Sequence, residues 1–239
     1  MNQFYTSPEH VTEKQLTITG QEAAHAVKSL RLHDGDEIWV TDGAGSRFRC
    51  IITDASPSRV VCDIEERAVH EPASPAIYVA IGVLKKRDRM EFAIEKGTEI
   101  GAAGFLFFRG DHSEKPSLNL RRAEATALSA MKQSLRLHLP VVESFKSLDA
   151  LLKTRHAARF YTAHQDATES FEEVIGEEIQ NVLADKRIVV VGPEGGLSDR
   201  EVTLLKQADS HFVGLGSHRL RAETAAIVAA DRCLQALRR

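Results

Sequence analysis

The stretch Val189–Ser198 constrains the fold of this chain more than any other part of its sequence. Three consecutive valines predict a strand buried on both faces, and Ser198 with Glu201 predicts a capping box that begins a helix. The turn between them contains three glycines, Gly192, Gly195 and Gly196. Glycine permits positive φ and lets the backbone approach a bound molecule closely. Because ligands of open α/β sheets bind at such strand-to-helix turns, the sequence predicts an α/β fold with a ligand site here.

A second stretch, His211–Ala225, repeats this pattern of a short strand, glycines and a helix. The two turns lie about thirty residues apart, the length of a βα repeat, so we expect adjacent parallel strands to present both loops to one ligand. Neither turn has the spacing of a Walker loop or of a dinucleotide-binding fingerprint. Glycines also occur in such loops for turn geometry alone, and that alternative stays open at this point.

The first seventy or so residues predict a small β-rich domain. Thr19 and Glu22 have the spacing of a capping box for a short helix. Apolar and polar residues then alternate in three segments, with the apolar positions at Ile38, Val40, Phe48, Cys50, Ile52, Val60, Cys62 and Ile64. A period of two between turn residues is typical of a small antiparallel barrel or meander.

Pro72 and Pro75 flank a short polar stretch that does not easily continue a strand, so we place a linker there. The predicted domains are residues 1–71 and residues 72–239. Strands and helices alternate beyond the linker: a strand at 77–84, a helix from a cap at Asp88 to about 100, a strand at 105–108, a helix at 118–137, and strands near 141, 160, 189 and 212. This alternation predicts a mostly parallel sheet covered on both faces by helices.

The net charge of −3 is not typical of a protein that neutralises many phosphates. One basic cluster, Lys85–Arg89, nevertheless follows an apolar strand, where a binding face would lie. A solvated charge run is the alternative interpretation. The three cysteines lack metal or redox spacing, so we expect reduced, mostly buried thiols and no metal site. We find no membrane span or secretion signal and expect a cytoplasmic protein.

Several motifs together resemble one family. They are Arg31-Leu32 near the start, Lys86 with Asp88-Arg89-Met90 in the middle, and Gly192-Pro193-Glu194-Gly195-Gly196, Leu215-Gly216 and Leu220-Arg221-Ala222-Glu223-Thr224-Ala225 in the C-terminal part. On these residues the chain resembles the ribosomal RNA small subunit methyltransferase E family, which belongs to the SPOUT methyltransferases. The chain departs from the family's usual residues at His218-Arg219, where the family has Arg-Ile, at Gly97 and at Lys132.

The resemblance implies a SPOUT-type parallel sheet with a deep trefoil knot, preceded by a small PUA-like β-barrel that binds RNA. It implies S-adenosyl-L-methionine as cofactor and methylation of N3 of one uridine in 16S rRNA of the 30S subunit. It also implies a homodimer. Within this interpretation, the alternative is a sister SPOUT enzyme that acts on another rRNA or tRNA position.

Methylation of uridine N3 requires loss of the imide proton and stabilisation of the anion that develops on the flanking carbonyl oxygens. Arg221 is the candidate for the stabilising role, because its planar fork matches oxygen acceptors. Glu194 and Glu223 are the candidate bases. Two alternatives stay open: Glu223 as a first-turn carboxylate that favours the helix dipole, and Glu194 as an acceptor for backbone amides.

The remaining predicted site residues fall into two sets. For the cofactor we expect His164, Val191, Gly192, Gly195, Gly196, Leu215, Gly216, Leu220 and Thr224. For RNA we expect Lys86, Arg87, Arg89, Arg31 and Arg109, for which ordinary surface charge is the alternative.

Two other classes of protein share parts of this pattern. Glycine turns at helix starts also hold anions, as in phosphate- or nucleotide-binding enzymes. A β-barrel with a basic cluster is also compatible with a noncatalytic RNA-binding module. Binding of ATP or a dinucleotide without S-adenosylmethionine would favour the first, and RNA binding without a change in nucleotide mass would favour the second.

Overall fold

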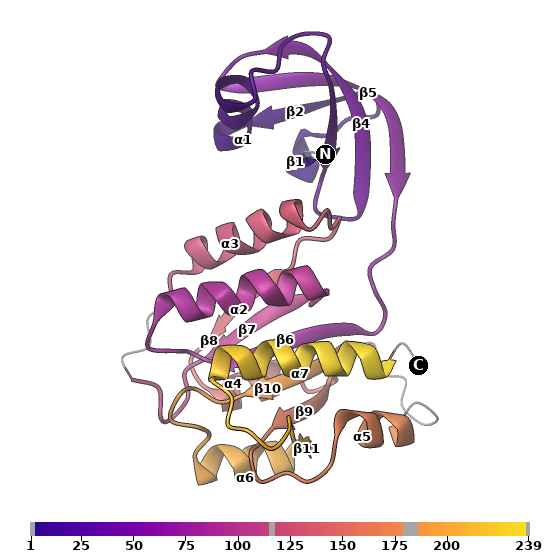
Figure 1. Ribbon diagram of the computed structural model, residues 1–239. Coiled ribbons are helices and arrows are strands. Elements are labelled where there is room, and N and C mark those ends of the chain that lie inside the picture. Colours follow the sequence, from indigo (N-terminus) through magenta and orange to yellow (C-terminus); the bar gives the residue numbers. More distant parts are fainter. Residues whose placement is uncertain (1–2, 115–117, 179–185, 238–239) are drawn as a thin grey trace. The chain divides into compact units, whose positions relative to one another are not determined.

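The computed structural model describes residues 3–114, 118–178 and 186–237, which form two compact units (Figure 1). The first unit comprises the chain up to Pro72 together with Met131–Leu139. The second comprises Ala73–Ala130 and the chain from Pro140 onwards. The division drawn from the sequence assigned Met131–Leu139 to the second domain, whereas the structure groups this segment with the first unit.

The first unit contains a five-stranded sheet with the order β1-β3-β4-β5-β2. Strand β1 pairs with β3 in parallel, and the other neighbours are antiparallel. Its elements are β1 (Gln3–Tyr5), the 3-10 helix η1 (Pro8–His10), β2 (Gln15–Thr19), α1 (Gly20–Ala24), the π-helical turn η2 (His25–Ser29), β3 (Glu37–Thr41), β4 (Ser46–Ala55) and β5 (Arg59–Val69).

The alternating apolar positions form the core of this unit, as the period of two predicts. Seven of those positions are buried, namely Ile38, Val40, Phe48, Cys50, Ile52, Val60 and Cys62, and Ile64 packs against them. Burial raises the pKa of both the Cys50 and Cys62 thiols to about 12, so neither is a reactive thiolate. All three cysteines are free and buried, which confirms the expectation of buried thiols.

The capping box predicted at Thr19 is wrong, although the helix itself exists. Thr19 is the N-cap of α1, but its side chain makes no capping hydrogen bond. Glu22 instead accepts a hydrogen bond from the backbone N–H of Tyr5 at 3.2 Å and pairs with Lys132. The Glu22 carboxylate therefore binds residues that are distant in the sequence, and it does not form the capping box that the local pattern predicts.

The second unit is built on a six-stranded sheet with the order β11-β9-β10-β6-β7-β8, in which every pair is parallel. Its strands are β6 (Ala76–Gly82), β7 (Gly104–Phe108), β8 (Val141–Phe145), β9 (Arg159–Ala163), β10 (Lys186–Val191) and β11 (His211–Val213). Its helices are α2 (Arg87–Ile100), α3 (Leu120–Gln133), α4 (Leu148–Thr154), α5 (Phe171–Glu178), α6 (Asp199–Gln207) and α7 (Ala222–Leu237).

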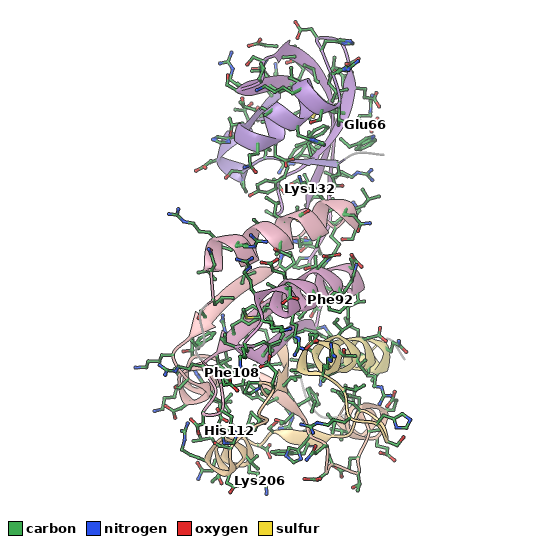
Figure 2. The ribbon with its side chains drawn as sticks, turned by 60° about the vertical axis from the view of Figure 1, so that its left-hand side comes forward. Glu66, Phe92, Phe108, His112, Lys132 and Lys206 are labelled. Atoms are coloured by element: carbon green, nitrogen blue, oxygen red, sulfur yellow. The ribbon has the colours of Figure 1, made fainter. Side chains whose placement is uncertain are left out.

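Helices cover both faces of this sheet (Figure 1), which confirms the α/β architecture predicted from the sequence. Successive strand residues point to opposite faces, so Val189 and Val191 pack with α2, α5 and α7, whereas Ile188 and Val190 pack with α4 and α6. Figure 2 shows Phe108 inside the unit, where it is fully buried, and Lys206 on the outside of α6.

Three predictions made from the sequence differ from the structure. The strands that precede the two glycine loops are not neighbours, because β9 lies between β10 and β11. Helix α2 begins at Arg87 with Lys86 as its N-cap, so Asp88 lies in the first turn rather than at the cap. Helix α3 spans only Leu120–Gln133.

Among the helices of the described ranges, none is long and apolar enough to cross a bilayer.

Candidate functional site

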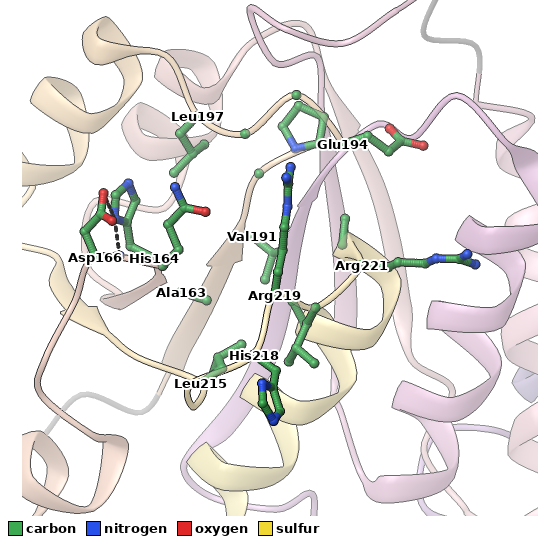
Figure 3. Close-up of a pocket in the computed structure, with 18 of the residues that line it drawn as sticks. Ala163, His164, Asp166, Val191, Glu194, Leu197, Leu215, His218, Arg219 and Arg221 are labelled. Carbon is green, nitrogen blue, oxygen red and sulfur yellow. Dashed lines mark hydrogen bonds and ion pairs between the residues drawn. The ribbon is translucent and has the colours of Figure 1, made fainter.

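Three loops meet at the carboxyl ends of β9, β10 and β11 and enclose a pocket of about 820 Å³ (Figure 3). The lining comes from residues 163–166, 191–197 and 215–222, with Arg89 and Ala225. Since parallel strands end at the same edge of a sheet, three chain segments far apart in sequence reach one space. The prediction that both glycine loops serve one site is consistent with this pocket, although the strands involved are not adjacent.

Two glycines of the lining have backbones that other residues rarely adopt. Gly196 has a φ of 76° and Gly216 a φ of 116°. A Cβ added at either position would meet nothing within 4 Å, so both backbones border open space. Gly195 is different, because an added Cβ would lie 2.8 Å from Cβ of His112. Gly196 and Gly216 therefore leave backbone accessible beside the pocket, whereas Gly195 is required for close packing against His112.

Arg89, which lines the pocket, lies between two carboxylates, Glu194 of the lining and Glu223 of α7. Glu194 accepts a hydrogen bond from the backbone N–H of Lys85 at 3.1 Å. Arg89 lies between Glu194, with Nη1 3.6 Å from Oε1, and Glu223, with Nε 3.5 Å from Oε1. The side chain of Glu223 is buried, and its Oε2 atom has no hydrogen-bond partner among the described residues. The Arg89 guanidinium thus pairs with both carboxylates, and Glu223 Oε2 is a buried acceptor without a hydrogen-bond partner among the described residues.

The helix after the first glycine loop begins as the sequence predicts. Ser198 Oγ accepts from the N–H of Glu201, and the Glu201 carboxylate accepts from the N–H of Ser198 at 2.9 Å, which completes the capping box. A second Glu201 oxygen accepts from the N–H of Asp111 at 3.1 Å. Glu201 is fully buried, so this carboxylate ties the start of α6 to the loop after β7.

The loop after β7 also holds the glycine loop through side chains. Ser198 Oγ lies 2.6 Å from Asp111 Oδ2, and the Arg200 guanidinium contacts both Asp111 oxygens at 2.6 and 2.9 Å. The hydrogen bonds from Arg200 and Ser198 lower the pKa of Asp111 below its usual value. His112 Nδ1 lies 3.1 Å from the carbonyl oxygen of Gly195. Sequence reasoning missed both residues, although the turn residues Arg109 and Gly110 place this polar pair in the loop after the apolar run 105–108, where ligand-binding residues of α/β sheets often lie.

Most of the predicted pocket residues lie together. The lining contains His164, Val191, Gly192, Glu194, Gly195, Gly196, Leu215, Gly216, Leu220 and Arg221, and also Arg89, which the sequence assigned to RNA. The Arg221 side chain points away from the middle of the pocket in Figure 3.

The other predicted residues lie outside the lining. Glu223 and Thr224 are in the first turn of α7, directly after the lining residues Arg221 and Ala222. Lys86, Arg87 and Arg109 are exposed in the same unit, and Arg87 pairs with Glu91 at 3.3 Å. Arg31 belongs to the first unit. Within the described ranges, no group of three or more His, Cys, Asp or Glu side chains is placed to hold a metal ion.

Comparison with known proteins identifies the family of each of the two domains. Residues 71–233 match the RNA methyltransferase domain family, and residues 18–65 match the RNA methyltransferase PUA domain family. The protein is therefore an RNA methyltransferase with an N-terminal PUA domain. It is 31% identical to "Ribosomal RNA small subunit methyltransferase E" of Bacillus subtilis over 223 residues, which cover 89% of this chain and 87% of that protein. The chain belongs to the ribosomal RNA small subunit methyltransferase E family.

Solved structures share the fold along the whole chain. A probable rRNA-methyltransferase from Porphyromonas gingivalis is 31% identical with a TM-score of 0.84, and the match covers 100% of both chains. A ribosomal RNA small subunit methyltransferase E from Neisseria gonorrhoeae, solved bound to S-adenosyl methionine, has a TM-score of 0.80 at 23% identity and covers 99% of this chain and 98% of that one. The second unit thus has the SPOUT-like fold and the first the PUA fold that the family resemblance implies.

Proposed function

We propose that this enzyme binds S-adenosylmethionine in the pocket at the ends of β9, β10 and β11 and methylates N3 of a specific uridine in 16S rRNA. The observation that carries the proposal is the convergence of three loops, two of them glycine-rich, on one pocket in a chain of this family. A relative solved with S-adenosyl methionine supports the choice of cofactor.

The residues present fit this cofactor. Gly196 and Gly216 leave open space where any other residue would place a Cβ. Leu215, Leu220 and Val191 add apolar surface, which suits an adenine ring between backbone donors and acceptors. When bound, S-adenosylmethionine supplies a methyl group that its sulfonium already activates.

The protein then has to orient the uracil ring and remove its N3 proton. In our proposal, Arg221 stabilises the negative charge that develops on the uracil oxygens. Its side chain has to turn toward the pocket for this role, because it points outward in Figure 3. Glu194 lines the pocket and is the better placed of the two candidate bases. Glu223 is buried, is not one of the lining residues and pairs with Arg89, so we assign Glu223 a positioning role.

In this proposal the two domains have different roles. The PUA-like domain, residues 1–71, binds RNA, and residues 72–239 form the SPOUT methyltransferase domain with a deep trefoil knot around the cofactor. Lys86, Arg87 and Arg109 are exposed cations of the second domain, and Arg31 is one of the first. We propose that they contact RNA phosphates. The enzyme acts in the cytoplasm as a homodimer, with the 30S subunit as its partner.

The test is methyl transfer from labelled S-adenosylmethionine to 30S subunits that lack small-subunit methylation, followed by mass mapping of the modified nucleotide. We expect a single 3-methyluridine in 16S rRNA. Cofactor binding without transfer to these subunits would favour the sister-enzyme alternative, which other rRNA and tRNA substrates would then identify. Absence of both binding and transfer would reject the proposed function.

A further inference from the structure

Three arginines line the pocket, and they are not equivalent. Arg89 is held between Glu194 and Glu223. Arg221 points away from the middle of the pocket. Arg219 alone of the three lies across the pocket, with its guanidinium end toward the loop that carries Glu194 (Figure 3). The pocket therefore contains one inward arginine that is not engaged with a carboxylate.

Arg219 is exposed, and it forms no ion pair or side-chain hydrogen bond with any residue in the part of the chain that the structure describes. An arginine guanidinium has five N–H donors in a rigid fork. This fork matches the two oxygens of a carboxylate and forms charge-assisted, bidentate hydrogen bonds with it. The geometry thus offers an anion site at Arg219 in a pocket that carries charges of both signs, because the carboxylates Glu194 and Asp166 also line it, together with Arg89 and Arg221.

These charges match the methyl donor of the proposed function. S-adenosylmethionine has two cationic groups, its sulfonium and its ammonium, and one anionic group, its carboxylate. We propose that Arg219 binds this carboxylate and so fixes the methionine part of the cofactor, an inference that rests on the function proposed above. Arg219 is then a cofactor-positioning residue, separate from Arg221, which acts on the uracil ring.

The experiment compares two adenosine thioethers by titration calorimetry. S-adenosylhomocysteine keeps the amino-acid carboxylate, whereas 5′-methylthioadenosine lacks the amino-acid end. Both are titrated into the wild-type protein, Arg219→Met and Arg219→Lys. The matched control is Arg59→Met, because Arg59 is an exposed arginine in the other unit and lies outside the pocket.

We expect Arg219→Met to weaken S-adenosylhomocysteine binding by about 10- to 100-fold, which corresponds to the loss of a hydrogen-bonded charge pair. Binding of 5′-methylthioadenosine should change by less than about twofold, since that ligand offers no anion to Arg219. Arg219→Lys should recover part of the loss because it keeps the charge but not the fork. Arg59→Met should bind both ligands as the wild type does.

Equal weakening of both ligands would mean that Arg219 only shapes the pocket, and the inference would be wrong. Unchanged affinity for S-adenosylhomocysteine would also overturn it. A shallower salt dependence of RNA binding in Arg219→Met would then identify an RNA phosphate as the true partner. If the wild-type protein binds neither thioether, the proposed function itself fails and this inference falls with it.

Discussion

The Nε atom of Arg89 lies 3.5 Å from Oε1 of Glu223, and this pair joins helix α2 to the first turn of α7. Glu223 is buried, and its other oxygen has no hydrogen-bond partner among the described residues. Arg89 is therefore the main compensation for a charge that is costly to bury alone.

Arg89→Met should lower the free energy of unfolding by about 1–3 kcal/mol, because it leaves the Glu223 carboxylate buried without a cation. The double variant Arg89→Met/Glu223→Gln should regain most of that loss, since the second change removes the uncompensated charge. Urea unfolding of the single and double variants measures both effects. Equal instability of the two variants would show that Arg89 acts through its packing rather than through Glu223.

Gly196→Ala should weaken the binding of S-adenosylhomocysteine. Its φ of 76° is left-handed, and an added Cβ would project into the open space beside the pocket. The strain should also lower stability by about 1–2 kcal/mol. Gly20→Ala is the matched control, because Gly20 has a φ of 63° and equally open surroundings but belongs to the other unit.

Both alanine variants should lose similar stability in urea unfolding, and only Gly196→Ala should lose affinity in calorimetry. Gly195 is unsuitable for this comparison, because a Cβ there would lie 2.8 Å from His112 and disturb the fold directly. Normal affinity in a folded Gly196→Ala protein would show that this loop does not border the cofactor.

The sequence predicts local features of this site well and long-range ones poorly. The capping box of Ser198 and Glu201 forms because both partners are three residues apart and no distant group displaces them. The same pattern at Thr19 fails because Lys132, far along the chain, binds Glu22. The position of β9 between β10 and β11 likewise cannot be predicted from hydrophobic periodicity. Periodicity indicates which face of a strand is buried, but not which strands pair with it.

The residues that sequence reasoning missed follow the same rule. Asp111 and His112 contact Ser198, Arg200 and Gly195 across more than eighty positions of the chain. No local pattern encodes such partners, so only the folded sheet brings them together. The role of the loop glycines was predictable only in part. Of the three in the first loop, only Gly196 has a positive φ, whereas at Gly192 and Gly195 an added Cβ would meet neighbouring atoms at 2.9 and 2.8 Å.

The contact between Asp111 and Arg200 predicts a pH dependence of stability. Hydrogen bonds from Arg200 and Ser198 lower the pKa of Asp111 in the folded protein below its ordinary value of 3.8. A carboxyl with a lowered folded pKa contributes stability above its unfolded pKa and loses it as the pH falls through the folded value. The wild type should thus be more stable than Asp111→Asn at neutral pH, and the difference should shrink below about pH 4. Urea unfolding at pH 7, 5 and 3.5 tests this, and a difference that stays constant down to pH 3.5 would contradict it.

Arg221→Met should separate chemistry from cofactor binding. We expect the single-turnover rate of methyl transfer to fall by about 100- to 1000-fold, the usual cost of removing one group that stabilises a developing oxyanion. S-adenosylhomocysteine affinity should stay within about twofold of the wild type, because the Arg221 side chain points away from the pocket and holds no charge of the cofactor in our proposal. Arg219→Met should show the opposite pattern, with its main effect on affinity. Rapid-quench transfer to 30S subunits at saturating cofactor, together with calorimetry on the same proteins, measures the two quantities independently. A loss of affinity in Arg221→Met equal to its loss of rate would assign this arginine to the cofactor instead of the uracil ring.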